Sequence, residues 1–284
     1  DVCSSDLVHY AIQTNGMVIN DKWCRFLKEH RFLVGLSIDG HPLAHDRHRL
    51  DAKGRGTFAR VLQTKRLLDA YQIEYNVLCV LTNPLAKEAQ RVFDFLKEEQ
   101  IAFVQFIPCL ADLDATSTND YALTPRSFAG FYQQLLAFWL QELKQGRYLS
   151  IKLFDDLLNL LVRQQVTACG ILGNCQVQYV IEADGSVYPC DFYVLDEFRM
   201  GYIQEQTLRE LFSQDCSQQF LCQKKDMPSK CTQCPFQKMC RGGCKRMKDA
   251  MYVDSEGFCG YQELLKDFTP RINEILGLLQ GVRQ

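Results

Sequence analysis

The sequence predicts an α/β fold: a parallel sheet, open or wound into a barrel, followed by a cysteine-rich region. Short apolar runs with strand character alternate with amphipathic helical segments through the first half, which is the pattern of parallel sheets. Four of the fourteen cysteines (Cys3, Cys24, Cys79 and Cys109) lie far apart, and the others fall within residues 169–259. With 284 residues, the chain can hold one large domain or two unequal ones.

Strands are expected where apolar, β-branched or aromatic residues form short runs bounded by turn signals. These runs are residues 8–13, 32–38, 74–81 and 102–107, and Ala183-Asp184-Gly185 indicates a hairpin. Helices are expected over residues 21–30, after an N-capping Thr57, from Asn83-Pro84, from Thr124-Pro125, and over residues 152–164.

The carboxyl ends of parallel strands carry the chemistry in folds of this kind. The strand ends here are Gln13-Thr14-Asn15, Ser37-Ile38-Asp39 and Pro108-Cys109-Leu110.

Composition and charge restrict the function. A net charge of −2 argues against bulk electrostatic binding to nucleic acid or to an anionic membrane. No apolar run reaches the roughly 18 residues of a membrane-spanning helix, and the first residues lack the pattern of a secretion signal. We therefore expect a cytoplasmic protein whose cysteines stay reduced and bind metal rather than form disulfides.

Residues 1–7 read DVCSSDL, a string that a common sequencing-adapter sequence would encode. This predicts a non-native tail, with the authentic protein beginning near Val8 and Cys3 carrying no function. The alternative is a genuine surface tail.

The clustered cysteines follow two spacings, C-x5-C-x14-C from Cys169 and C-x2-C-x5-C-x3-C-x14-C from Cys231. Four thiolates satisfy either tetrahedral zinc or a [4Fe–4S] cluster, so spacing alone leaves the metal open. Neighbouring basic residues either offset the charge of such a site or form a solvated face. They are Lys238, Arg241, Lys245 and Arg246. The cysteines outside these spacings are expected to be small buried apolar residues. They are Cys24, Cys79, Cys109, Cys216 and Cys222.

These cysteine spacings resemble the twin-cluster SPASM domain of radical S-adenosylmethionine peptide-modifying enzymes. Four shorter segments, in order, resemble pieces of anaerobic sulfatase-maturating enzymes: QTNG from Gln13, VGLSIDG from Val34, GRGT from Gly54, and PCL from Pro108. The resemblance implies a radical-SAM (β/α)6 barrel, here partial, followed by a cysteine-rich SPASM iron–sulfur domain. The domains would be residues 8–165 and 166–262, with a C-terminal helix over residues 263–284.

The family resemblance implies two auxiliary [4Fe–4S] clusters with interleaved ligands. The first would use Cys169, Cys175, Cys190 and Cys244, and the second Cys231, Cys234, Cys240 and Cys259. Asp191, directly after Cys190, would be the general base, a role that burial of its carboxyl group would favour. The alternative is an Asp in a solvated turn.

The implied reaction begins at a third [4Fe–4S] cluster that binds S-adenosylmethionine. A 5′-deoxyadenosyl radical abstracts a Cβ hydrogen from a sulfatase Cys or Ser, Asp191 takes the proton, an auxiliary cluster takes the electron, and hydrolysis gives formylglycine. Residues where the family contacts the cofactor are Gln13, Asn15, Ser37, Arg49 and Leu110. The alternatives are purely structural roles: a capping Ser37, a packed Leu110 and an Arg49 in a surface loop.

The sequence departs from the family at its start. It contains no C-x3-C-x2-C motif for the third cluster and no glycine-rich segment after a second strand. We therefore expect an N-terminally truncated chain that lacks the first two barrel strands. This fragment would have no radical activity, whereas its full-length parent would.

Two other functions stay open at this point. One is a different SPASM peptide maturase that forms thioether or carbon–carbon crosslinks, and the other is a zinc-binding interaction module. For the maturase, the expected partners are a sulfatase polypeptide and a flavodoxin- or ferredoxin-type reductant, with no nucleic acid and no membrane. The sequence does not decide between Cys-type and Ser-type sulfatases.

Overall fold

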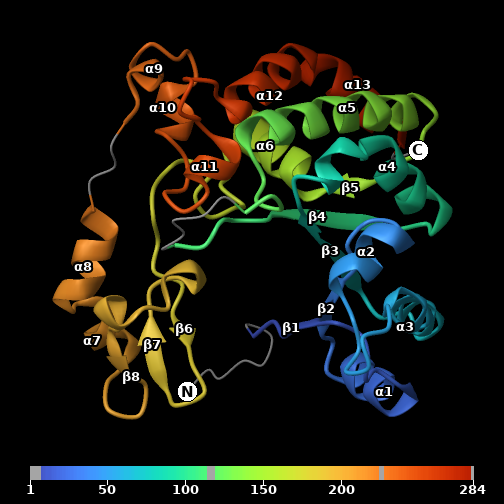
Figure 1. Ribbon diagram of the computed structural model, residues 1–284, viewed down its shortest axis with the longest axis horizontal. Coiled ribbons are helices and arrows are strands. Elements are labelled where there is room, and N and C mark those ends of the chain that lie inside the picture. Colours follow the sequence, from blue (N-terminus) through green and yellow to red (C-terminus); the bar gives the residue numbers. More distant parts are fainter. Residues whose placement is uncertain (1–7, 114–118, 224–226, 283–284) are drawn as a thin grey trace.

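The computed structural model describes residues 8–113, 119–223 and 227–282. The predicted tail, including Cys3, lies outside the described residues. A five-stranded sheet has the order β1-β2-β3-β4-β5, with every neighbouring pair parallel (Figure 1). Its strands are β1 Ala11–Thr14, β2 Leu33–Ser37, β3 Tyr75–Leu81, β4 Phe103–Pro108 and β5 Ser150–Ile151. The predicted α/β fold with a parallel sheet is confirmed. The sequence does not predict β5, because two residues leave no periodic pattern.

Helices follow the strands where the capping residues indicate. Asn20 accepts a hydrogen bond from the Trp23 N–H at the start of α1, and Thr124 accepts one from the Ser127 N–H at the start of α5. The helices of this half are α1 Asp21–Glu29, α2 Pro42–His48, α3 Phe58–Ala70, the 3₁₀ helix η2 Leu85–Lys87, α4 Ala89–Glu98, α5 Pro125–Lys144 and α6 Lys152–Arg163.

The prediction that Thr57 caps α3 is wrong. Thr57 has a helical backbone conformation (φ −105°, ψ −2°) rather than the extended one of an N-cap, and its side chain makes no capping hydrogen bond. The Thr57 hydroxyl instead donates to the Arg49 carbonyl at 2.9 Å. Asp46 takes the capping role, because its Oδ1 accepts from the Phe58 N–H at 2.8 Å.

The aromatic residues of α5 form part of the core, as expected. Phe128, Phe131 and Trp139 are fully buried, and the Trp139 indole N–H donates to the Leu149 carbonyl at 2.8 Å. This helix also receives the end of the chain: α12 Gly260–Phe268 and α13 Ile272–Val282, joined by the 3₁₀ helix η5 Thr269–Arg271, both pack against α5 (Figure 1). The C-terminal helices therefore fix the cysteine-rich region to the first half.

The cysteine-rich half contains a small antiparallel sheet, β6 Val180–Ile181, β7 Ser186–Tyr188 and β8 Gly201–Tyr202. The predicted hairpin is present between β6 and β7. Short helices follow, and α11 packs against α5. They are η3 Asp191–Tyr193, η4 Asp196–Phe198, α7 Leu208–Phe212, α8 Asp215–Cys222, α9 Ser229–Thr232, α10 Gln237–Cys240 and α11 Lys248–Met251.

The cysteines outside the two spacings behave in different ways. Cys24 and Cys79 are buried, as expected, while Cys109 and Cys216 are half-buried. The expectation is wrong for Cys222, which is exposed at the end of α8, because the buried face of that helix is formed by Ser217 and Phe220.

Among the described residues, no helix combines the length and apolar character needed to cross a bilayer.

Candidate metal centres and cleft

A cleft of about 460 Å³ lies between the parallel sheet and the cysteine-rich region. Gln13 at the end of β1 and Pro108 at the end of β4 line one side. The other side is lined by Cys169, Cys175, Cys190, Asp191 and Cys244. One cavity therefore gathers four cysteines and a carboxylate beside the strand ends where parallel sheets carry their chemistry.

The four cysteines of this cleft, the first set, are accessible. Cys169 is exposed, and Cys175, Cys190 and Cys244 are half-buried. The backbone N–H groups of Gln176 and Phe192 hydrogen-bond to the Cys169 and Cys190 sulfurs.

Asp191 begins η3 directly after Cys190, and its Oδ1 accepts a hydrogen bond from the Cys190 Sγ at 3.5 Å. Burial of this carboxyl group was expected to favour the role of general base, but the Asp191 side chain is exposed in the wall of the cleft. Its position therefore favours contact with an incoming substrate rather than enclosure by the protein.

A second cavity, of about 20 Å³, gathers Cys231, Cys234, Cys240 and Cys259, the second set. Cys231 belongs to α9, Cys240 ends α10, and Cys259 caps α12, with its sulfur accepting from the Gln262 N–H. Three of the four are buried, and Cys234 is half-buried. The neighbouring helices and turns therefore close this site almost completely.

Burial and neighbouring thiols act on the acidity of both sets. Burial raises the pKa of the Cys190 thiol to about 12 and that of Cys259 to about 11. Burial also raises the pKa of Cys231, and the nearby Cys240 and Cys234 raise it further. Cys190, Cys231 and Cys259 are therefore neutral thiols at pH 7, and a metal must displace their protons to bind them.

The chemistry of each cavity fits a four-iron cluster. Each supplies four sulfur ligands, the number that a [4Fe–4S] cluster takes. Among the described residues, no three His, Cys, Asp or Glu side chains come close enough to enclose one metal ion. A cluster of four irons needs a wider arrangement, because each thiolate binds a separate iron at its own corner.

One buried polar atom in the cavity walls also fits a missing partner. The Tyr261 hydroxyl is buried without a hydrogen-bond partner among the described residues, and its O–H can donate to a sulfur. Tyr261 lines both cavities. Such atoms are rare in folded proteins, and an absent ligand is one of their ordinary explanations.

The two sets share one short turn. Cys240 ends α10, Arg241 adopts a left-handed backbone conformation (φ 44°), and Cys244 follows in the other cavity. The segment from Cys169 approaches this turn so closely that a Cβ on Gly170 would lie 2.8 Å from Cys244 Cβ, and one on Gly173 only 2.3 Å from the Cys240 carbonyl oxygen. Both glycines have positive φ, so this contact needs residues without a side chain.

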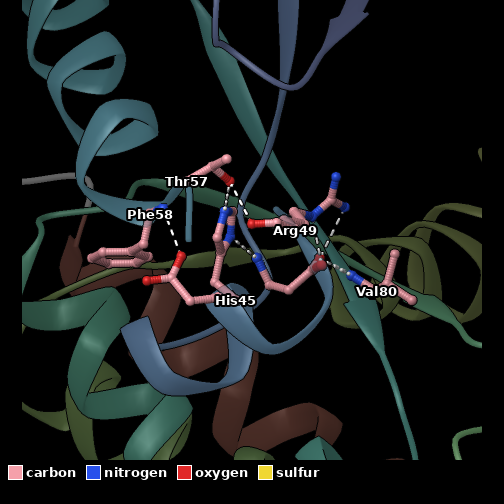
Figure 2. Close-up of polar contacts among 7 residues, drawn as sticks. His45, Arg49, Thr57, Phe58 and Val80 are labelled. Atoms are coloured by element: carbon pink, nitrogen blue, oxygen red, sulfur yellow. Dashed lines mark hydrogen bonds and ion pairs between the residues drawn. The ribbon is translucent and has the colours of Figure 1, made fainter. Parts of the chain in front are cut away.

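A third cavity, of about 360 Å³, lies near the ends of β2 and β3 and is lined by Asp39, Arg49 and Cys109, among others. Arg49 Nε and Nη2 donate to the Asp39 carboxylate at 2.6 and 3.1 Å, and the Val80 N–H donates to Asp39 Oδ1 at 2.8 Å. Figure 2 shows Arg49, His45, Thr57 and Val80 held in one polar network. Arg49 is therefore fixed by an ion pair rather than free in a surface loop.

His45 stabilises this network through hydrogen bonds at both of its ring nitrogens. Its Nδ1 accepts from the Asp39 N–H at 3.1 Å, and its Nε2 lies 3.1 Å from the Thr57 hydroxyl (Figure 2). Because Nδ1 accepts, the proton of the neutral ring is on Nε2 and is donated to Thr57. Burial lowers the pKa of His45, so the ring stays neutral. Sequence reasoning did not single out His45, since a lone histidine in a helix carries no motif.

The structure does not bring all predicted cofactor contacts together. Gln13 lines the cleft and Arg49 the third cavity. Among the described residues, Asn15, Ser37 and Leu110 lie outside the walls of both. Asn15 Oδ1 accepts from the Met17 N–H in a turn, Ser37 is half-buried at the end of β2, and Leu110 packs against the core.

Known proteins share this combination of sheet and cysteine-rich region. The model of SPASM, an iron–sulfur cluster-binding domain, matches residues 169–235. The cysteine-type anaerobic sulfatase-maturating enzyme of Clostridium novyi is 39% identical over 92% of this chain and 70% of its own length. The serine-type enzyme of Bacteroides thetaiotaomicron is 29% identical over 88% of this chain and 64% of its own length.

A solved structure agrees with these relatives. Native anSMEcpe with bound AdoMet and Cp18Cys peptide has a TM-score of 0.87 at 36% identity, covering 95% of this chain and 76% of that chain. The fold and the cysteine-rich domain define a radical S-adenosylmethionine enzyme with an iron–sulfur SPASM domain. Within that class, the chain belongs to the family of anaerobic sulfatase-maturating enzymes. The resemblance stated from the sequence is thereby confirmed, ahead of the zinc-binding module and the crosslinking maturase.

Proposed function

We propose that the cleft is where a sulfatase cysteine is oxidised to formylglycine, with Asp191 as the general base. The observation that carries this proposal is the single cavity lined by Asp191, Gln13 and the first cysteine set. Cysteine is the favoured target because identity to the cysteine-type relative is 39%, against 29% for the serine-type relative.

The oxidation removes two hydrogens from the –CH2–SH side chain. We assign the thiol proton to an Asp191 carboxylate oxygen, which the exposed position of Asp191 in the cleft wall makes accessible. When bound, S-adenosylmethionine and its cluster supply a radical that takes the Cβ hydrogen atom, and the auxiliary clusters accept the remaining electron. The resulting thioaldehyde adds water and releases hydrogen sulfide, which leaves the aldehyde of formylglycine.

The ligand assignment follows the two cavities. Cys169, Cys175, Cys190 and Cys244 would hold one cluster beside the substrate, and Cys231, Cys234, Cys240 and Cys259 the other. Gln13 would contact the cofactor or the peptide from the end of β1. Arg49 would meet a cofactor carboxylate with its Nη1, since its contacts to Asp39 use Nε and Nη2.

We also propose that Asn15, Ser37 and Leu110 contact S-adenosylmethionine, because each lies at or just after the carboxyl end of a strand. We also propose residues 8–165 as the barrel part, 166–262 as the cluster domain and 263–284 as the C-terminal helical segment. A flavodoxin- or ferredoxin-type protein would supply electrons. The cytoplasm is the expected compartment, because cluster ligands must stay reduced.

The sequence has no C-x3-C-x2-C motif, so we expect these 284 residues alone to cleave no S-adenosylmethionine. The test joins a segment with that motif to the chain and incubates the anaerobically reconstituted protein with a cysteine-containing sulfatase peptide. Mass spectrometry should show formylglycine with the cysteine peptide and less with its serine counterpart. Cofactor cleavage without peptide oxidation would contradict the proposal.

A further inference from the structure

Gln262 contacts the second cysteine set at two points. It lies in the first turn of α12, is 8% exposed and lines the second cavity. Its backbone N–H donates to the Cys259 sulfur at 3.4 Å, and its side-chain Nε2 donates to the Cys234 sulfur at 3.2 Å. One residue therefore donates hydrogen bonds to two of the four sulfurs, which lie 25 positions apart in the sequence.

The direction of the Gln262 side chain follows from chemistry. A cysteine thiolate accepts hydrogen bonds and has no proton to donate, so only the amide NH2 can face Cys234. The Oε1 atom is left buried without a partner among the described residues. A buried polar atom without a partner costs desolvation free energy, and the hydrogen bond from Nε2 to the charged sulfur must offset that cost.

We propose that Gln262 raises the reduction potential of the cluster held by the second cysteine set. This inference rests on the proposed function, in which Cys231, Cys234, Cys240 and Cys259 bind a [4Fe–4S] cluster. Reduction adds negative charge that is partly carried by the sulfurs, and an N–H dipole aimed at a sulfur stabilises the reduced state more than the oxidised one. Hydrogen bonds to the sulfurs are among the factors that set cluster potentials.

The first cysteine set differs in the donors that hydrogen-bond to its sulfurs. Backbone N–H groups of Gln176 and Phe192 meet its sulfurs, and the Asp191 carboxylate lies beside Cys190. A side-chain donor can be removed by substitution, whereas a backbone donor cannot. Gln262 therefore offers a way to change the potential at the second site and leave the first unchanged.

The test uses Gln262→Leu, which removes the donor without adding charge, and Gln262→Glu, which keeps the shape but places a carboxylate near Cys234. Gln133→Leu is the matched control, because Gln133 also contacts α12, through Asp267 Oδ2 at 2.7 Å, and its amide bonds to no sulfur. Each protein is reconstituted anaerobically and assayed for iron, and its midpoint potentials are measured by redox titration with electron paramagnetic resonance.

We expect both Gln262 variants to retain the wild-type iron content and to shift one of two potentials to a more negative value. The equilibrium constant for reduction of this cluster should change on the order of tenfold, which corresponds to a shift of 59 mV for a one-electron couple. The shift should be larger for Gln262→Glu and absent in Gln133→Leu. This order of the shifts distinguishes an effect of the lost hydrogen bond from an effect of a loosened α12.

Three results would overturn the inference. Full iron content with unchanged potentials in both Gln262 variants would show that the contact does not tune the cluster, while the ligand assignment would stand. Loss of the second cluster in both variants, with retention in Gln133→Leu, would show that Gln262 serves assembly instead. Wild-type protein that binds no second cluster would remove the proposed ligand set itself.

Discussion

The two cysteine cavities contain the same four-sulfur chemistry in opposite surroundings. The first lies in a cleft of about 460 Å³, and none of its cysteines is buried. The second measures about 20 Å³, and three of its four cysteines are buried. We propose a division of work from this difference, in which the substrate meets the open first cavity and the more enclosed second cavity serves electron transfer.

The origin of the difference lies in the neighbouring elements. The second set is built on short helices and on α12, which packs against α5. The first set comes from loop segments and from the cysteine that follows the turn after α10. Asp191 lines only the open cavity, so the proposed general base is separated in space from the second cysteine set.

Removing one cysteine from each cavity should give the largest and clearest contrast. Cys169→Ala and Cys259→Ala should each reduce the iron content from about eight to about four per chain. Cys259→Ala should also lower the free energy of unfolding by about 1–2 kcal/mol, because it removes the cap of α12. Cys169 is exposed, so its loss should change stability by less than about 0.5 kcal/mol.

Iron analysis and denaturant unfolding of the metal-free chains measure these effects. Cys216→Ala is the control and should keep all the iron, since the Cys216 sulfur donates to the Arg199 carbonyl and lines neither cavity. Equal destabilisation by Cys169→Ala and Cys259→Ala would remove the structural distinction between the cavities.

Asp191→Asn tests whether the open cavity is the reactive one. In the protein supplied with the third-cluster motif, the rate of peptide oxidation should fall by roughly 10²–10⁴-fold, because the general base is lost. The iron content should not change. Asp196→Asn, at an exposed position in η4, provides the control. A rate within twofold of the wild type would assign the proton to another group.

Gly173→Ala tests how far the two cavities depend on each other. A Cβ at this position would lie 2.3 Å from the Cys240 carbonyl oxygen, and φ is +71°. We expect a loss of about 1–3 kcal/mol in stability from the strained backbone. Lower iron occupancy should appear at both sites, although Gly173 belongs to the segment of the first set. Gly54→Ala, with a similar φ of +74° and no atom within 4 Å of the added Cβ, isolates the backbone effect.

The smallest expected effect is a pH dependence of the metal-free chain. The pKa of Cys190 is raised to about 12 and that of Cys259 to about 11, above the value of about 8.5 in an unfolded chain. The unfolded chain therefore releases these protons first as pH rises. The contribution of these two thiols to the free energy of unfolding should be constant below about pH 8.5 and fall above it, and Cys190→Ser should weaken the decline. A rise in stability between pH 8.5 and 10 would contradict these shifts.

Much of the fold could be predicted from the sequence, because its strands are long enough to show a pattern. The four expected strands match β1 to β4, whereas the two-residue β5 leaves no signal. Thr57 has the residue type of a cap, but only the backbone conformation shows that Asp46 takes that role.

The site was predictable to a lesser degree. Spacing alone left the metal open, and the division into two sets came from the family resemblance. In the structure, the separation of Cys240 from Cys244 between two cavities depends on the fold of the turn after Cys240. Gln262 belongs to no motif, since an amide donor to sulfur has no fixed sequence spacing. Exposure of Asp191 likewise depends on which segments pack around it.

The most direct test is the iron, sulfide and zinc content of the anaerobically reconstituted chain, together with its visible spectrum. Two [4Fe–4S] clusters would give about eight iron and eight sulfide per chain and a brown protein. Half of this content should remain in Cys169→Ala and in Cys259→Ala. A colourless protein that binds zinc without iron would contradict the assignment of both cavities.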